Sequence, residues 1–91
     1  MMISTDFQNA QETVKRLAYR PSNERMLQLY SLYKQATVGD CNTTEPSQDD
    51  LAMRAKYDAW MNLQGTEKEE AMRKYVNLVQ FLIAKPSQEL V

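Results

Sequence analysis

The sequence has 91 residues, which suits one domain whose single core removes about 60% of the unfolded chain's surface from water. Eleven basic and 12 acidic residues give a formal charge of −1, which excludes the bulk basic field that recruits nucleic acid or an anionic membrane nonspecifically. The absence of histidine and the single cysteine, Cys41, exclude a Cys/His zinc site and an internal disulfide, and they favour a reducing, cytosol-like compartment.

The first ten residues, MMISTDFQNA, contain neither a positively charged segment nor an apolar run, so we expect no secretory signal and no mitochondrial leader. The longest apolar-rich stretch, residues 75–84, is interrupted by Asn77 and Gln80. It is far shorter than the roughly 20 residues that a membrane-spanning helix needs. These features predict a soluble protein in the cytoplasm.

Good helix formers dominate the composition, and only two residues are glycine, so an all-α fold is expected. The first predicted helix covers about residues 5–19, and Pro21 ends it. Ser22 and Asn23 can cap the second helix, residues 24–38, and Gly39 provides its left-handed stop. The first helix has one apolar stripe at three- and four-residue steps: Phe7, Ala10, Val14, Leu17 and Ala18.

Residues 40–50, DCNTTEPSQDD, are rich in turn formers and predict a loop of eleven residues, long for a domain of this size. Ser47 and Asp50 resemble a capping box for a third helix, which runs to about residue 63 and stops at Gly65. Thr66 and Glu69 repeat that signature for a fourth helix, which ends at Pro86. The fourth helix has the strongest apolar stripe, formed by Ala71, Met72, Tyr75, Val76, Leu78, Val79, Leu82 and Ile83.

The residue types argue against an enzyme. Histidine, the common general base, is missing, and Cys41 lies in the loop with no basic neighbour in sequence to lower its pKa. The paired carboxylates at Asp49 and Asp50 and at residues 67–70 lie at predicted helix starts, where negative charge is favourable for structural reasons alone. We therefore predict no catalytic residue and no metal site.

The two glycines fall at helix ends, so no glycine-rich phosphate loop exists, and any nucleotide must be held by side chains. Tyr30, Tyr33 and Lys34 share one helical face, where two phenols and an ammonium suit an aromatic base beside a phosphate. A tyrosine stripe at helical spacing is more often a core edge, with Lys34 solvated. Considered singly, Lys15 and Lys56 are ordinary surface lysines, and Tyr75 and Trp60 are ordinary core residues.

Taken together, four segments resemble the acyl-CoA-binding protein family in order and spacing. They are VKRL (14–17), MLQLYSLYKQATVGD (26–40), AKYDAW (55–60) and LQGTEKEEAMRKYV (63–76), and they place the match between about Phe7 and Leu82. The resemblance implies a four-helix bundle with its long loop between the second and third helices. It also implies a single acyl-CoA-binding domain over residues 1–91.

The resemblance further implies a monomeric, non-catalytic carrier that needs no cofactor and binds a long-chain acyl-CoA such as palmitoyl-CoA one-to-one. By matching position, Tyr30, Lys34 and Lys56 hold phosphate, while Tyr33 and the stem of Lys15 enclose adenine. Tyr75 lines the inner part of the site, and Met26 and Leu27 are candidates to line the acyl groove. Ala52 replaces a lysine that is frequent in the family, so we expect weaker phosphate binding.

Other functions are also compatible with the sequence. The chain could be an acyl-CoA-recruiting module of a larger protein, such as a peroxisomal enoyl-CoA isomerase or a membrane-anchored scaffold, which would place it in peroxisomes or at a membrane. The family has also been assigned peptide-precursor and protein-interaction roles. Transient contacts with membranes or acyl-CoA-using enzymes are compatible with a carrier. A net charge of −1 does not favour binding to nucleic acid.

Overall fold

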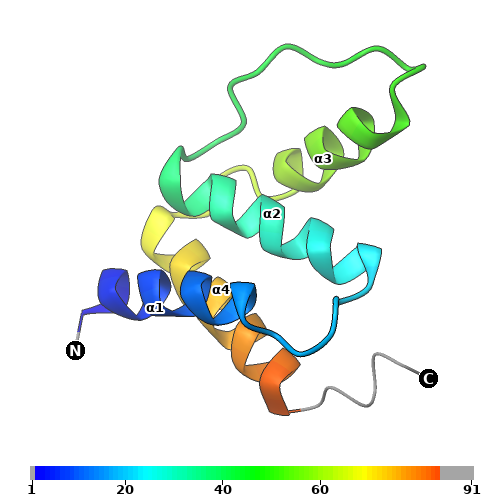
Figure 1. Cartoon of the computed structure of the whole chain (residues 1–91). Helices are drawn as coiled ribbons and strands as arrows, with labels where there is room; N and C mark the ends of the chain where they lie inside the picture. The colour runs from blue at the N-terminus through cyan, green and yellow to red at the C-terminus, as the bar shows by residue number, and fades with distance from the viewer. Residues whose placement is uncertain (1, 85–91) are drawn as a thin grey trace.

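Four α-helices account for most of residues 2–84, the part of the chain that the computed structural model describes. A long loop, residues 38–50, joins the second helix to the third (Figure 1). Residues 2–84 contain no strand, and the predicted all-α class and long loop are confirmed. The helices are α1 (Ile3–Lys15), α2 (Asn23–Thr37), α3 (Leu51–Met61) and α4 (Lys68–Ala84).

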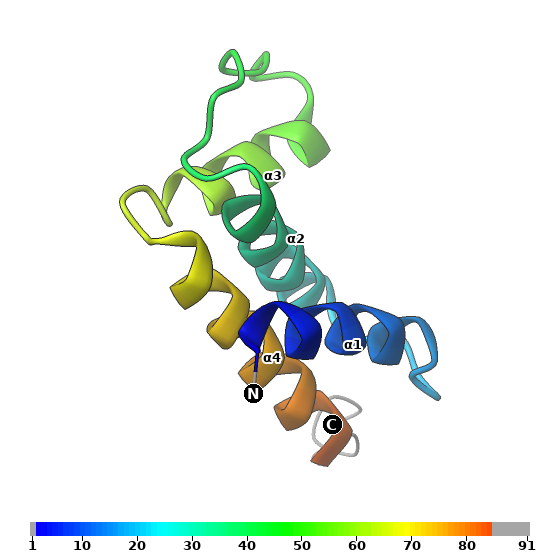
Figure 2. The same cartoon turned by 90° about the vertical axis from the view of Figure 1, so that its left-hand side faces the viewer.

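Helix α4 is central to the packing. It contacts α1 and α2, and α2 in turn contacts α3; Figure 2 shows α1 lying across α4. The predicted stripe of α4 supplies four buried residues, and the other two core helices complete the core. These buried residues are Ala71, Tyr75, Val79 and Leu82 on α4, Phe7 and Ala10 on α1, and Leu29, Leu32 and Ala36 on α2. Each large apolar side chain among them contributes roughly 1.5–3 kcal/mol by leaving water.

Helix α1 ends at Lys15, so the prediction that it reaches Tyr19 is wrong. The backbone N–H of Arg16 donates to the Thr13 carbonyl at 2.9 Å, which tightens the last turn. Beyond it, the Tyr19 hydroxyl donates to the carbonyl oxygen of Leu82 on α4 at 2.9 Å. A contact with α4, which the local sequence pattern does not contain, therefore determines the path of the chain after Lys15.

Helix α2 begins and ends within one residue of its predicted bounds. The Ser22 side chain accepts a hydrogen bond from the Arg25 N–H at 3.2 Å, which confirms Ser22 as the N-cap. Gly39 has φ of 99°, a left-handed conformation that residues with a Cβ rarely adopt, and it confirms the predicted stop.

Helix α3 begins at Leu51 with Asp50 as its N-cap, so the predicted cap at Ser47 is wrong. The Asp50 carboxylate accepts from the Met53 N–H at 3.1 Å. The Ser47 hydroxyl oxygen accepts instead from the Asp49 N–H at 3.1 Å, and this local turn leaves the capping position to Asp50.

The ends of the last two helices depart slightly from prediction. Helix α3 ends at Met61, two residues early, and Gly65 follows with the expected positive φ of 90°. Helix α4 begins at Lys68, and its first hydrogen bond runs from the Ala71 N–H to the Glu67 carbonyl at 2.9 Å, so Glu67 rather than Thr66 precedes the helix. The predicted end at Pro86 lies outside the described residues. In the range 2–84, no helix is long and apolar enough to cross a membrane.

Candidate functional site

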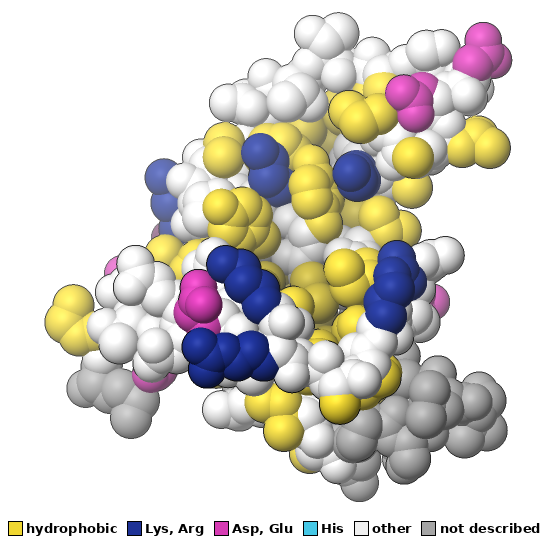
Figure 3. All heavy atoms as spheres, viewed as in Figure 1, with side chains coloured by type: hydrophobic (Ala, Val, Ile, Leu, Met, Phe, Trp, Pro, Cys, Tyr) yellow, Lys and Arg dark blue, Asp and Glu magenta, His cyan; other side chains and the backbone are white. Residues whose placement is uncertain are grey.

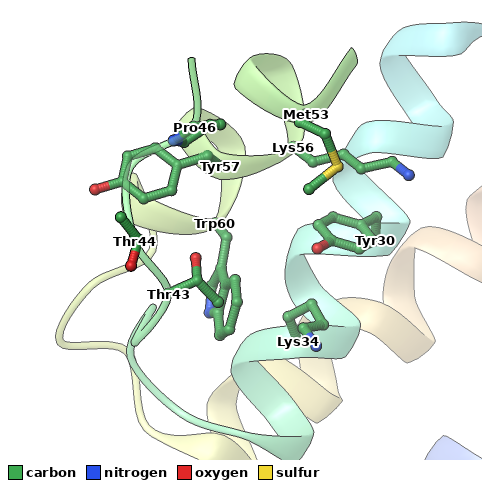
Figure 4. Close-up of a pocket in the computed structure, with 9 residues that line it drawn as sticks. All are labelled: Tyr30, Lys34, Thr43, Thr44, Pro46, Met53, Lys56, Tyr57 and Trp60. Carbon is green, nitrogen blue, oxygen red and sulfur yellow. The ribbon is translucent and has the colours of Figure 1, made fainter. Parts of the chain in front are cut away.

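A pocket of about 130 Å³ lies where α2, the long loop and α3 meet (Figure 4). Each of the three segments supplies part of its wall, and the loop residues lie across from those of α2. The lining residues are Tyr30 and Lys34 from α2, Thr43, Thr44 and Pro46 from the loop, and Met53, Lys56, Tyr57 and Trp60 from α3. The pocket thus combines two ammonium groups, two threonine hydroxyls and three aromatic rings.

One face of α3 presents four residues to this pocket. Met53, Lys56, Tyr57 and Trp60 are spaced by three, four and seven residues, which places them on one side of a helix. Trp60 is the only residue of α3 that is buried, and its indole N–H donates to the Gly39 carbonyl at 2.8 Å. This bond fastens α3 to the end of α2 and so fixes the two helices that form the pocket.

The two lysines of the pocket lie over aromatic rings. The Lys34 Nζ is 5.0 Å from the centroid of the Trp60 ring, and the Lys56 Nζ is 5.4 Å from the centroid of the Tyr30 ring. Neither lysine has an ion-pair partner within residues 2–84. Two ammonium groups that no carboxylate neutralises, held at one pocket, attract an anion even on a protein whose net charge is −1.

A second pocket, of about 560 Å³, adjoins the first and shares Tyr30 and Lys56 with it. Its other lining residues are Arg20, Asn23, Met26 and Leu27 on one side and Ala52 and Ala55 of α3 on the other. The space-filling view of this face shows Lys and Arg side chains around an exposed hydrophobic surface (Figure 3). The arrangement suits an amphipathic ligand with an anionic part and an apolar part.

Tyr33 and Tyr75 lie together, but in a separate aromatic cluster. The Phe7 ring stacks against Tyr33 with centroids 6.2 Å apart, and it meets Tyr75 edge-on at 5.0 Å. Tyr33 is 40% exposed, whereas Tyr75 is buried. Burial, assisted by the nearby Tyr33, raises the pKa of Tyr75, so its phenol stays a neutral donor at physiological pH.

Lys15 is the one predicted site residue that lies apart from these groups. Its side chain is exposed, and its Nζ forms an ion pair with Glu12 Oε2 at 3.3 Å. It lines neither of the two pockets. The structure therefore gathers Tyr30, Lys34, Lys56, Met26 and Leu27 around two adjoining pockets, and it brings Tyr33 to Tyr75 through Phe7.

Sequence reasoning did not assign several residues that line the pockets. Met53, Tyr57 and Trp60 share the helical spacing of Lys56, and that signal could have placed them at the site. Thr43, Thr44 and Pro46 gave no such signal, because a loop has no periodicity that tells which side chains face inward.

A polar network around the buried Gln35 positions the end of α2. The Gln35 Nε2 donates to Asp40 Oδ1 at 2.9 Å and to the Thr66 carbonyl at 2.7 Å, and the Gly65 N–H donates to the same Asp40 oxygen at 2.8 Å. The bond from Gly65, followed by that from Gln35, holds the pKa of Asp40 below its usual value. The network ties α2 to the turn before α4 and so fixes the backbone that carries Lys34.

These features define a class of protein: a small all-helical one with an open site in which cationic, aromatic and apolar surfaces adjoin. Among residues 2–84, no group of three or more acidic, cysteine or histidine side chains is arranged to hold a metal ion.

Comparison with known proteins assigns the family. The family model described as acyl CoA binding protein matches residues 4–79. The acyl-CoA-binding protein of Dictyostelium discoideum is 48% identical over 81 residues, which cover 89% of this chain and 96% of that protein. The acyl-CoA-binding protein homolog of Drosophila melanogaster is 45% identical over 84 residues, 92% of this chain and 98% of that protein.

The fold agrees with solved structures of the same kind. The crystal structure of Oryza sativa acyl-CoA-binding protein 2 superposes with a TM-score of 0.88 at 41% identity, covering 96% of this chain and 97% of that one. This chain belongs to the acyl-CoA-binding protein family, and the resemblance noted in its sequence is confirmed.

Proposed function

We propose that this chain binds long-chain fatty acyl-CoA esters one-to-one, as a monomeric carrier that keeps a pool of them in the cytoplasm and catalyses no reaction. Residues 1–91 act in this proposal as one acyl-CoA-binding domain. The observation that carries it is the convergence of Lys34 and Lys56, from two different helices, on a pocket that adjoins a second one lined in part by Met26 and Leu27. The names of the relatives point to the same ligand.

The phosphate groups of CoA are assigned to the first pocket. Lys34 and Lys56 supply charge and Tyr30 supplies a phenol, and hydrogen bonds to charged groups of this kind contribute roughly 1.5–3 kcal/mol each. Both ammonium groups rest over aromatic rings before the ligand arrives, which limits the side-chain entropy lost on binding.

The adenine is assigned to Tyr33, whose ring is 40% exposed and supported from behind by Phe7. A flat aromatic ring held against a second ring is suited to stack a purine. The stem of Lys15 covers the opposite face of the base once the side chain leaves Glu12, and an exposed ion pair of this kind costs at most about 1 kcal/mol to break. Tyr75 lines the inner part of the site.

The acyl chain is assigned to the second pocket, along Met26 and Leu27. Each methylene that leaves water there contributes about 0.8 kcal/mol. Ala52, in place of a lysine frequent in the family, also lines this pocket and supplies no cation there. We therefore expect weaker phosphate binding, for free CoA and for the ester alike.

The biological role follows from reversible binding. Enclosure of the acyl chain and the thioester limits their contact with water and lets the chain deliver acyl-CoA to enzymes or membranes. A single cysteine without a disulfide partner is compatible with the reducing cytoplasm. Binding needs neither a metal nor a cofactor, and the proposal assigns no role to nucleic acid.

The test is a calorimetric titration of the chain with palmitoyl-CoA, free CoA and palmitate, each below its micelle concentration. We expect tight binding of the ester at a stoichiometry of one, with both fragments much weaker, because only the ester occupies both pockets. Absence of ester binding by a chain whose helix content is intact would refute the proposal. Binding of palmitate as tight as that of its ester would assign the site to fatty acids instead.

A further inference from the structure

The long loop forms one wall of the phosphate pocket, but a single side chain attaches its middle to a helix. Within residues 2–84, the hydrogen bonds and ion pairs that reach residues 41–49 from a helix all come from Arg54 of α3. Its guanidinium forms a short hydrogen-bonded ion pair with Glu45 and lies 3.5 Å from the Pro46 carbonyl oxygen. Arg54 therefore supplies the polar contacts that hold this wall to α3.

Arg54 is itself held from the helix side. Its Nε lies 3.6 Å from Asp58 Oδ1, one helical turn further on, and its guanidinium is 5.8 Å from the centroid of the Tyr57 ring. The side chain is only 29% exposed. A partly buried guanidinium that rests near the Tyr57 ring presents its Nη1 to Glu45 at little further entropic cost.

Three of the nine residues that line the pocket, Thr43, Thr44 and Pro46, belong to the stretch of loop that Arg54 fastens. They face Tyr30 and Lys34 across the cavity (Figure 4). Arg54 does not line the pocket, so apart from the long-range effect of its charge it acts on a bound molecule through the loop.

We propose that Arg54 is a positioning residue, which clamps the loop through Glu45 as a closed wall of the pocket and thereby slows release of the ligand. The proposal rests on acyl-CoA binding, the proposed function. The clamp acts on a bound ligand because escape of the phosphate side requires the loop to move away from α2. Opening of the clamp precedes or accompanies that movement.

The experiment compares two variants that each remove one carboxylate partner of Arg54. Glu45→Gln breaks the tie between the loop and α3, whereas Asp58→Asn breaks a tie within α3 and leaves the loop attached. The two carboxylates are matched, with side chains 57% and 56% exposed, and each change raises the net charge by one.

Because both variants change the net charge by the same amount, a difference between them reports on the clamp and not on overall charge. Removal of a carboxylate near the site favours an anionic ligand, so electrostatics alone predicts slightly tighter binding in both variants. The clamp instead predicts weaker binding and faster release, and it predicts them for Glu45→Gln only. We expect its release rate to rise about two- to fivefold above that of Asp58→Asn, the range that corresponds to one partly exposed ion pair.

Release is measured by stopped flow, with excess palmitoyl-CoA displacing a fluorescent acyl-CoA. Backbone order parameters of residues 41–45 are measured by NMR relaxation without ligand. Faster release together with lower loop order parameters in Glu45→Gln, and neither change in Asp58→Asn, supports the clamp. Equal release rates in the two variants overturn it, whatever the order parameters show. Should the wild-type chain bind no acyl-CoA, the proposed function fails, and unchanged loop order parameters in Glu45→Gln would separately refute the clamp.

Discussion

Helices α4 and α3 use their side chains in opposite ways. Helix α4 buries four residues and packs against both α1 and α2, whereas α3 buries only Trp60 and packs against α2. In both ribbon views α3 and the long loop lie at one end of the molecule, away from the crossing of α1 and α4 (Figures 1 and 2). The comparison indicates that α4 serves mainly the core, whereas α3 contributes mainly side chains that line the proposed site, so substitutions in the two helices should have separable effects.

The largest expected effect is on stability. Leu82→Ala removes a fully buried side chain of α4 and should lower the free energy of unfolding by about 2–5 kcal/mol. The same change at Leu51 on α3, which is 77% exposed, should alter it by less than about 0.5 kcal/mol. Urea unfolding followed by circular dichroism measures both. Equal losses in the two variants would show that α3 belongs to the same cooperative core.

The next effect is on binding. Lys34→Ala and Lys56→Ala should each weaken palmitoyl-CoA binding about tenfold, because each removes a charge-assisted contact, while the midpoint of urea unfolding stays nearly unchanged. Lys74→Ala, on the exposed side of α4, is the control with the same change in net charge. Calorimetric titration measures the affinity of each variant for palmitoyl-CoA. A similar loss in all three variants would mean that overall charge, not the pocket, holds the ligand.

The smallest effect concerns the network that joins α2 to the turn before α4. The folded pKa of Asp40 lies below its unfolded value of 3.8, so its stabilising contribution is present above that value and is lost as the pH falls through the lower folded pKa. We expect the melting temperature of Asp40→Asn to fall less than that of wild type between about pH 5 and pH 2. Asp49→Asn, in the exposed loop, should follow wild type. Parallel curves for wild type and Asp40→Asn would remove Asp40 from the acid response.

The core was largely predictable because it follows local periodicity. The stripe of α4 contains all four of its buried residues, and the two glycines mark the left-handed turns after α2 and α3. The errors at Tyr19 and Ser47 share a cause. In each case a side-chain hydrogen bond made outside the helix, to Leu82 and to the Asp49 N–H respectively, determines where the helix ends or begins.

The site was predictable only in part. Spacing placed Tyr30 and Lys34 on one face of α2, and the family resemblance added Lys56, but no periodic signal reveals that two helices joined by a long loop bring their lysines to one pocket. The role of Arg54 was likewise invisible, since its partner Glu45 is nine residues away in an irregular segment. Contacts made by an irregular loop leave no periodic pattern in the sequence, so they are seen only in the three-dimensional structure.

Trp60 gives the molecule an intrinsic optical probe. It is the only tryptophan in the sequence, and its indole meets the Gly39 carbonyl on one side and lies 5.0 Å from the Lys34 ammonium. Indole fluorescence responds to nearby charge and to solvent, so a phosphate that draws Lys34 away should shift the emission. Undocking of α3 should shift it toward the spectrum of tryptophan in water. Ligand occupancy and detachment of this helix can therefore be followed by tryptophan fluorescence in the unlabelled chain.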